Sequence, residues 1–68
     1  METTMDFTIK GIDGHRFEVI MHTEKAKNLC NDLFCIRPEA VSWVGFGDSM
    51  IRSLVTEALD RKMIYRLG

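Results

Sequence analysis

The fold of this chain is decided by the stretch Ala40-Val41-Ser42-Trp43-Val44-Gly45-Phe46-Gly47-Asp48-Ser49. It begins as an apolar, strand-like run, stops at two glycines and leads into the start of a helix. Strand side chains alternate between faces, which would place Val41 and Trp43 on one side and Ala40, Val44 and Phe46 on the other. Both faces of the expected strand are therefore apolar, and one layer of helices can cover only one of them.

Two earlier segments alternate between apolar and polar residues and flank a turn, which predicts a hairpin of half-buried strands. Their apolar positions are Met5, Phe7, Ile9, Phe17, Val19 and Met21. A three-residue loop, Ile12-Asp13-Gly14, would pair Ile9 with Phe17 and bring both apolar sets to one face. We expect Gly14 in that loop to be a left-handed bulge residue.

Two helices are predicted from capping residues and helical periodicity. Thr23 is placed to cap the first helix, and Asp48 or Ser49 to cap the second. Pro38 prevents the first helix from continuing. The expected apolar stripes are Ala26, Leu29, Cys30 and Leu33 in the first helix, and Ile51, Leu54, Val55, Ala58, Leu59 and Met63 in the second.

The resulting order is β-β-α-β-α, with residues 64–67 open between a short final β-strand and a frayed helix end. Each helix has one apolar stripe, so each can pack against one surface. We therefore predict a single α+β domain over residues 1–68, a two-layer sandwich with both helices on one face of a small sheet.

Composition narrows the classes of function. The 68 residues are 46% hydrophobic and 28% charged with a net charge of −1, which is globular composition without a nucleic-acid-type excess of bases. No apolar run is long enough for a membrane span, and no signal-peptide pattern is present, so we expect a cytoplasmic protein without membrane partners. Two cysteines are too few for a disulfide framework, and we expect both thiols to be reduced and buried.

The segment Gly47-Asp48-Ser49-Met50 after an apolar strand resembles the first block of the GDSL (SGNH) hydrolases. This resemblance implies Ser49 as a nucleophile at a helix start. It covers about five residues and lacks the downstream Asp-x-x-His pair that activates the serine in that family, since His15 and His22 both lie upstream. A hydrolase is accordingly the remote alternative, and we expect a non-enzymatic protein.

Two further patterns have some features of ligand sites. Gly45-Phe46-Gly47 before a helix has the form of a phosphate cradle, but no lysine follows and Asp48 would repel an anion. His15, His22, Cys30 and Cys35 have the atoms for zinc, but their spacings match no common zinc finger. We expect neither a cofactor nor a metal.

The second helix and the basic turn at its end resemble the recognition helix of winged-helix DNA-binding proteins. A nucleic-acid-binding regulator, using Arg52, Arg61, Lys62 and Arg66, is therefore the main alternative function. The simpler explanation of these bases is a solvated helix face and partners for the helix dipole.

We favour a small interaction or regulatory module, inhibitor- or adaptor-like, that forms a homodimer or docks on a larger protein. Its expected contact residues lie on and beside the third strand: Trp43, Phe46, Val41, Val44 and Ile20. Exposed apolar clusters of this kind usually mark contact sites, and an exposed strand edge also allows strand addition.

Overall fold

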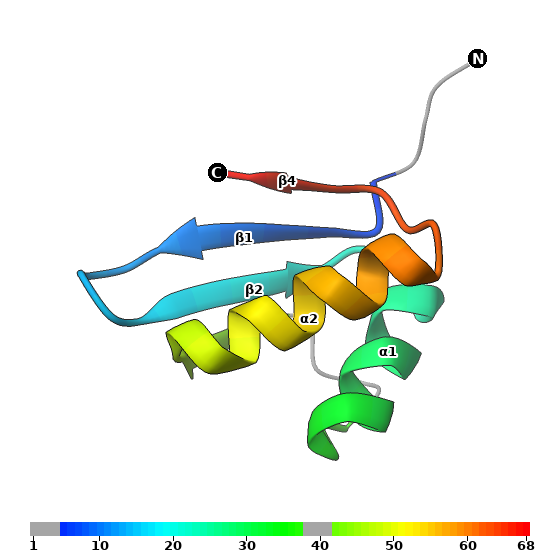
Figure 1. Ribbon diagram of the computed structural model, residues 1–68, viewed down its shortest axis with the longest axis horizontal. Helices are drawn as coiled ribbons and strands as arrows, with labels where there is room; N and C mark the ends of the chain where they lie inside the picture. The colour runs from blue at the N-terminus through cyan, green and yellow to red at the C-terminus, as the bar shows by residue number, and fades with distance from the viewer. Residues whose placement is uncertain (1–4, 38–41) are drawn as a thin grey trace.

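The computed structural model describes residues 5–37 and 42–68, and for residues 42–44 it describes the backbone. The elements along the chain are β1 (Phe7–Gly11), β2 (Phe17–Met21), α1 (Glu24–Phe34), β3 (Ser42–Phe46), α2 (Asp48–Asp60) and β4 (Tyr65–Leu67). This confirms the predicted α+β fold and shows that the segment left open in the sequence forms a short final strand (Figure 1).

The sheet has the order β3-β2-β1-β4. The β1–β2 and β2–β3 pairs are antiparallel, whereas β4 lies parallel to β1. The α2 helix connects the two edges of the sheet, since it leaves β3 at one edge and leads to β4 at the other. The order therefore leaves β3 and β4, the two strands nearest α2 in the sequence, as the edge strands.

The register of the hairpin differs from the predicted one by two residues. Ile9 pairs with Val19, and Gly11 pairs with Phe17, so the connection spans residues 12–16. The longer loop is stabilised by the Asp13 carboxylate, which accepts a hydrogen bond of 2.9 Å from the backbone N–H of His15. Gly14 does not have a positive φ, so the expected left-handed bulge is wrong. The two-residue shift keeps the same faces together, and the predicted apolar face of the hairpin is correct.

Both helices pack on the same face of the sheet (Figure 1). The core joins alternating strand residues to the apolar helix stripes, and its buried members are Phe7, Ile9, Val19, Met21, Ala26, Leu29, Cys30, Ile36, Phe46, Leu54, Ala58 and Met63. Leu59 departs from the predicted stripe of α2, because 61% of it is exposed. Neither of the two helices in the described residues covers the opposite face of the sheet, which is named here the uncovered face.

Asp6 joins three elements through its buried side chain, of which 7% is exposed. One carboxylate oxygen accepts a hydrogen bond from the hydroxyl of Thr23 at 2.7 Å, and the other accepts from the backbone N–H of Ile64 at 2.9 Å. The Asp6 backbone N–H also donates to the Ile64 carbonyl at 2.6 Å, and its carbonyl accepts from the N–H of His22 at 2.8 Å. This residue therefore connects β1 to the start of α1 and to the segment entering β4.

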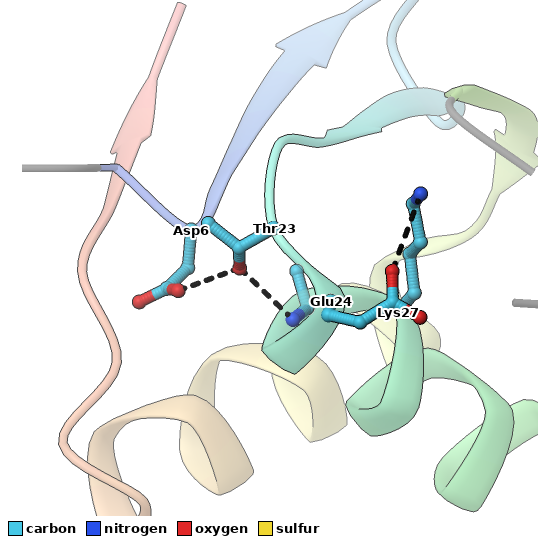
Figure 2. A network of polar contacts seen from close by, with 5 residues as sticks. Asp6, Thr23, Glu24 and Lys27 are labelled. Atoms are coloured by element: carbon cyan, nitrogen blue, oxygen red, sulfur yellow. Dashed lines mark hydrogen bonds and ion pairs between the residues drawn. The ribbon is translucent and has the colours of Figure 1, made fainter.

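Thr23 caps α1 as predicted. Its backbone is extended, and its hydroxyl oxygen accepts a hydrogen bond of 3.2 Å from the N–H of Ala26 while donating to Asp6 (Figure 2). Glu24 lies in the first turn and forms an ion pair of 3.5 Å with Lys27 on the exposed side of the helix. The Thr23 hydroxyl therefore bonds both to the first turn of its own helix and to Asp6, which precedes β1.

The start of α2 differs from the prediction. Gly47 is the N-cap residue and no side chain caps the helix, so Asp48 and Ser49 belong to its first turn. Asp48 is still well placed there, because the helix dipole favours an acidic side chain in the first turn.

The end of α2 is a Schellman motif with a lysine at the left-handed position. The N–H of Met63 donates to the carbonyl of Ala58 at 2.8 Å, and the N–H of Lys62 donates to Leu59 at 3.1 Å. Lys62 has a φ of 58°, a conformation that glycine adopts at lower cost. The Cβ atom of Lys62 is therefore a source of local strain at this turn.

We predict that Asp6→Asn lowers the free energy of unfolding by about 1–3 kcal/mol, because an amide cannot accept both hydrogen bonds with the strength of a carboxylate. Asp60→Asn is the matched control, since Asp60 is exposed and lies at the end of α2. Urea unfolding followed by circular dichroism measures both. Equal stability of the two variants would contradict the role assigned to Asp6.

We predict that Lys62→Gly raises the free energy of unfolding by about 0.5–1 kcal/mol, because glycine relieves the left-handed strain. Lys62→Ala removes the same charge and keeps the Cβ atom, so it should give no such gain. The comparison of the two melting temperatures separates backbone strain from the effect of charge, and equal shifts would rule out strain.

Candidate interaction surface

Gly45 forms a β-bulge in β3. Phe46 pairs with Phe17 and Val44 pairs with the next residue, Glu18, so Gly45 is the extra residue on the β3 side. Its φ is 101°, and a Cβ atom there would lie 3.5 Å from a guanidinium nitrogen of Arg16. A glycine is required at this position chiefly by the backbone conformation.

The bulge changes which residues of β3 share a face. The partners of Phe46 and Val44 are neighbours in β2, and neighbouring strand residues belong to opposite faces. The uninterrupted alternation expected over residues 40–46, which grouped Val44 with Phe46, is therefore wrong. An isolated glycine within a strand pattern is the signal that indicates such a bulge.

Phe46 lies in the core with 2% of it exposed. Its ring contacts the ring of Phe34, at the end of α1, edge to face, with centroids 5.4 Å apart. This corrects the expectation that Phe46 is a surface anchor, because the helix layer covers it. Phe46 instead fixes the end of β3 to the core.

Of the other expected contact residues, Ile20 lies next to the edge strand. The remaining ones lie, entirely or with their side chains, outside the described part of the structure. Val41 lies outside the described residues, as do the side chains of Trp43 and Val44. The backbone of Trp43 pairs with Val19, and that of Ser42 pairs with Ile20. Ile20 is half-buried on the uncovered face, one strand in from the edge.

The uncovered face carries a mixture of polar, charged and aliphatic side chains. In the described residues its members are Thr8, Lys10, Glu18, Ile20 and Arg66. Thr8 is only 4% exposed, although no helix lies over it, and its hydroxyl is 2.9 Å from Nε2 of His22. Thr8 is therefore closed to solvent, whereas Lys10 and Arg66 on the same face are exposed.

The two edges differ in charge. β3 has the sequence SWVGF and no ionisable side chain, whereas β4 has the sequence YRL with Arg66 at its centre. Charged residues on edge strands disfavour pairing with a second copy, because like charges then lie opposite each other. The uncharged β3 edge lacks this protection.

The four bases of the nucleic-acid alternative do not form one surface. Arg52 and Arg61 are nine positions apart, which places them on roughly opposite sides of a helix. Arg61 forms an ion pair of 3.3 Å with Asp32 of α1. Lys62 lies in the turn after α2, and Arg66 lies on the uncovered face of the sheet. The four bases therefore come from α2, its closing turn and β4, and one of them already pairs with an acidic side chain.

Ser49 is exposed in the first turn of α2. The hydrogen bonds of the described residues join His22 to Thr8 and include none between a histidine and Ser49. In the described residues, the serine–histidine hydrogen bond that the resemblance implies is therefore not formed.

Cys30 and Cys35 differ in environment. Cys30 is buried in the core, and burial raises the pKa of its thiol to about 11. Cys35 is exposed, which corrects the expectation that both thiols are buried. It ends α1 in a left-handed conformation with a φ of 58°, and its N–H donates to the Asn31 carbonyl at 2.9 Å.

Residues 5–37 and 42–68 contain no pocket and no group of three or more side chains placed to hold a metal ion. Of the two helices in these ranges, neither is long and apolar enough to cross a bilayer. No protein-family model matches the chain, and neither a curated protein nor a solved structure is significantly similar to it.

The sequence leaves residues 64–67 open between a short final strand and a frayed helix end, and the structure shows the strand. Tyr65 and Leu67 alternate with Arg66 in the manner of a strand, but three residues are too few to distinguish a strand from a frayed helix end. The pairing of β4 depends on long-range contacts, above all those of Asp6 with Ile64.

We predict that one thiol of the native protein reacts rapidly with a thiol reagent at pH 8 and that the other reacts only after unfolding. The reactive group is Cys35, because Cys30 is both inaccessible and protonated at that pH. Mass spectrometry of the labelled peptides identifies the site, and Cys35→Ala should remove the fast phase. Rapid labelling of Cys30 in the folded protein would show that the core opens more readily than its burial indicates.

Proposed function

We propose that this chain is a non-enzymatic interaction module that self-associates by pairing its β3 edge with the β3 edge of a second copy. The observation that carries the proposal is the position of β3 at the end of the sheet, combined with the absence of charge along it. Unpaired N–H and C=O groups of an edge strand form a template for another strand. Antiparallel addition would join two four-stranded sheets into one.

The contact between Phe46 and Phe34 supports this proposal. Because Phe46 is held in the core, the end of β3 has a defined position and does not have to be ordered on binding. The bulge at Gly45 limits regular pairing to the part of the strand that precedes it. The expected pairing therefore centres on Ser42, Trp43 and Val44.

Charge favours a second copy as the partner. Two β3 strands in antiparallel contact bring no like charges together, and the net charge of −1 per chain opposes association only weakly. Ile20 lies beside the backbone of Ser42 on the uncovered face, one strand in from the proposed contact. In such a small domain, association also adds to the limited apolar burial of a single chain.

A regulatory protein of this kind would act by presenting two copies of its surface to a target. Two observations favour this module over the alternatives. Arg61, one of the bases of the nucleic-acid alternative, pairs with Asp32, and the hydrogen-bonded histidine of the described residues, His22, contacts Thr8 and not Ser49.

We predict that the wild-type protein has the mass of a dimer by light scattering and that Ser42→Lys has the mass of one chain. Lysine in an edge strand places like charges near each other in the paired state and so opposes association. Ser53→Lys, on the exposed side of α2, is the matched control and should remain dimeric. Circular dichroism verifies that both variants keep the fold.

A wild-type protein that stays monomeric at all accessible concentrations would contradict the proposal. So would a dimer whose mass is unchanged by Ser42→Lys, because the contact would then lie elsewhere on the molecule.

A further inference from the structure

The opposite edge of the sheet has the geometry of a second strand-binding site. The Ile64 carbonyl accepts a hydrogen bond from the N–H of Asp6, and the N–H of Gly68 donates to the carbonyl of Ile9 at 2.7 Å. Ile64 and Gly68 thus direct backbone groups toward β1. Because these directions alternate along a strand, the N–H and C=O groups of Tyr65 and Leu67 are directed toward the free edge.

An exposed aliphatic side chain lies beside these free groups. Leu67 pairs with Ile9, which is buried under the helices, but 73% of Leu67 is exposed. Tyr65 is half-buried, because its ring stacks on Phe7 with centroids 5.1 Å apart. The helix layer therefore covers β1 and ends at β4, where it leaves Leu67 accessible to the side chains of an added strand.

The uncovered side of the same edge is basic. Arg66 pairs with Thr8, and Lys10 is the next residue of β1 on that face. The stem of Lys10 lies close to Gly68, since a Cβ atom on Gly68 would be 3.3 Å from the Cγ of Lys10. Glu18 of β2 lies opposite Lys10 on this face, whereas Arg66 lies opposite the uncharged Thr8. The ion pairs of the described residues are Lys27 with Glu24 and Arg61 with Asp32, so Arg66 is the base at this edge that an acidic partner would meet.

We propose that the β4 edge binds an extended segment of another protein in which an acidic side chain lies between two apolar ones. The backbone of that segment pairs with Tyr65 and Leu67. Its acidic side chain lies opposite Arg66 on the uncovered face, and its apolar side chains lie on the other face beside Leu67. This site is distinct from the β3 edge and does not depend on self-association.

Charge selects this partner over a second copy of the chain. Antiparallel pairing of two β4 strands about their centres would place Arg66 opposite Arg66 of the second copy, and like charges directly opposite are destabilising. A short edge also supplies few backbone hydrogen bonds, so affinity and selectivity depend on Arg66 and Leu67.

The test compares the binding of two fluorescein-labelled peptides, Glu-Val-Glu-Val-Glu and Lys-Val-Lys-Val-Lys, by fluorescence anisotropy. The wild-type protein should bind the acidic peptide about tenfold more tightly than the basic one, and Arg66→Glu should reverse this order. Leu67→Ser should weaken binding of the acidic peptide. Arg52→Glu, an equal change of charge on exposed α2, is the matched control and should keep the wild-type preference.

Amide chemical shifts locate the site. The acidic peptide should perturb the resonances of Tyr65, Arg66 and Leu67 and leave those of β3 unchanged. Ser42→Lys should retain peptide binding, which separates this site from the proposed dimer contact.

Several results would overturn the proposal. Equal binding of the two peptides, or no binding at the highest soluble concentration, would show that the edge does not accept an acidic strand. An equal effect of Arg52→Glu and Arg66→Glu would indicate general electrostatics. Loss of self-association in Arg66→Glu would assign the edge to a second copy.

Discussion

The buried carboxylate of Asp6 is the interaction on which the arrangement of this sheet depends. It accepts hydrogen bonds from the Thr23 hydroxyl and from the N–H of Ile64, two groups that are far apart in the sequence. A buried charge is tolerated only when such partners compensate for its lost hydration. Because Thr23 also caps α1, this carboxylate couples the start of a helix to the placement of the last strand.

The coupling explains how a strand of three residues can persist at the edge of the sheet. Parallel pairs are somewhat less stable per residue than antiparallel pairs, and β4 is both parallel and short. It is held at its start by Asp6, in its middle by the stacking of Tyr65 on Phe7, and at its end by the bond from Gly68 to Ile9. These three contacts fix the edge in place before any partner is bound.

Much of the architecture follows from local patterns in the sequence. The apolar alternation of the hairpin, the Thr23 cap and the stripes of both helices determine a two-layer α+β fold, and the structure has this fold. A two-residue error in the hairpin register did not change the predicted face, because side chains alternate with a period of two.

The sequence-based predictions are wrong at residues whose conformation depends on distant contacts or on the path of the backbone. Gly45 shifts the alternation of β3 by one residue and lets Phe46 enter the core. Cys35 and Lys62 take left-handed conformations although neither is a glycine. Hydrophobic periodicity does not reveal such positions, because it indicates only which side chains are buried. The hydrogen bonds that end a helix are made by backbone groups and depend on the path of the chain.

An open sheet has two edge strands, and each edge is either protected against pairing or paired with another strand. In this chain the bulge of β3 and the shortness of β4 limit regular pairing at both edges. Neither the bulge nor the short strand prevents pairing with another strand. β3 carries no charge, and β4 places an exposed leucine beside an arginine that has no acidic partner among the described residues. Charge therefore distinguishes the edges: the neutral edge is compatible with its own copy, and the basic edge favours an acidic strand from another chain.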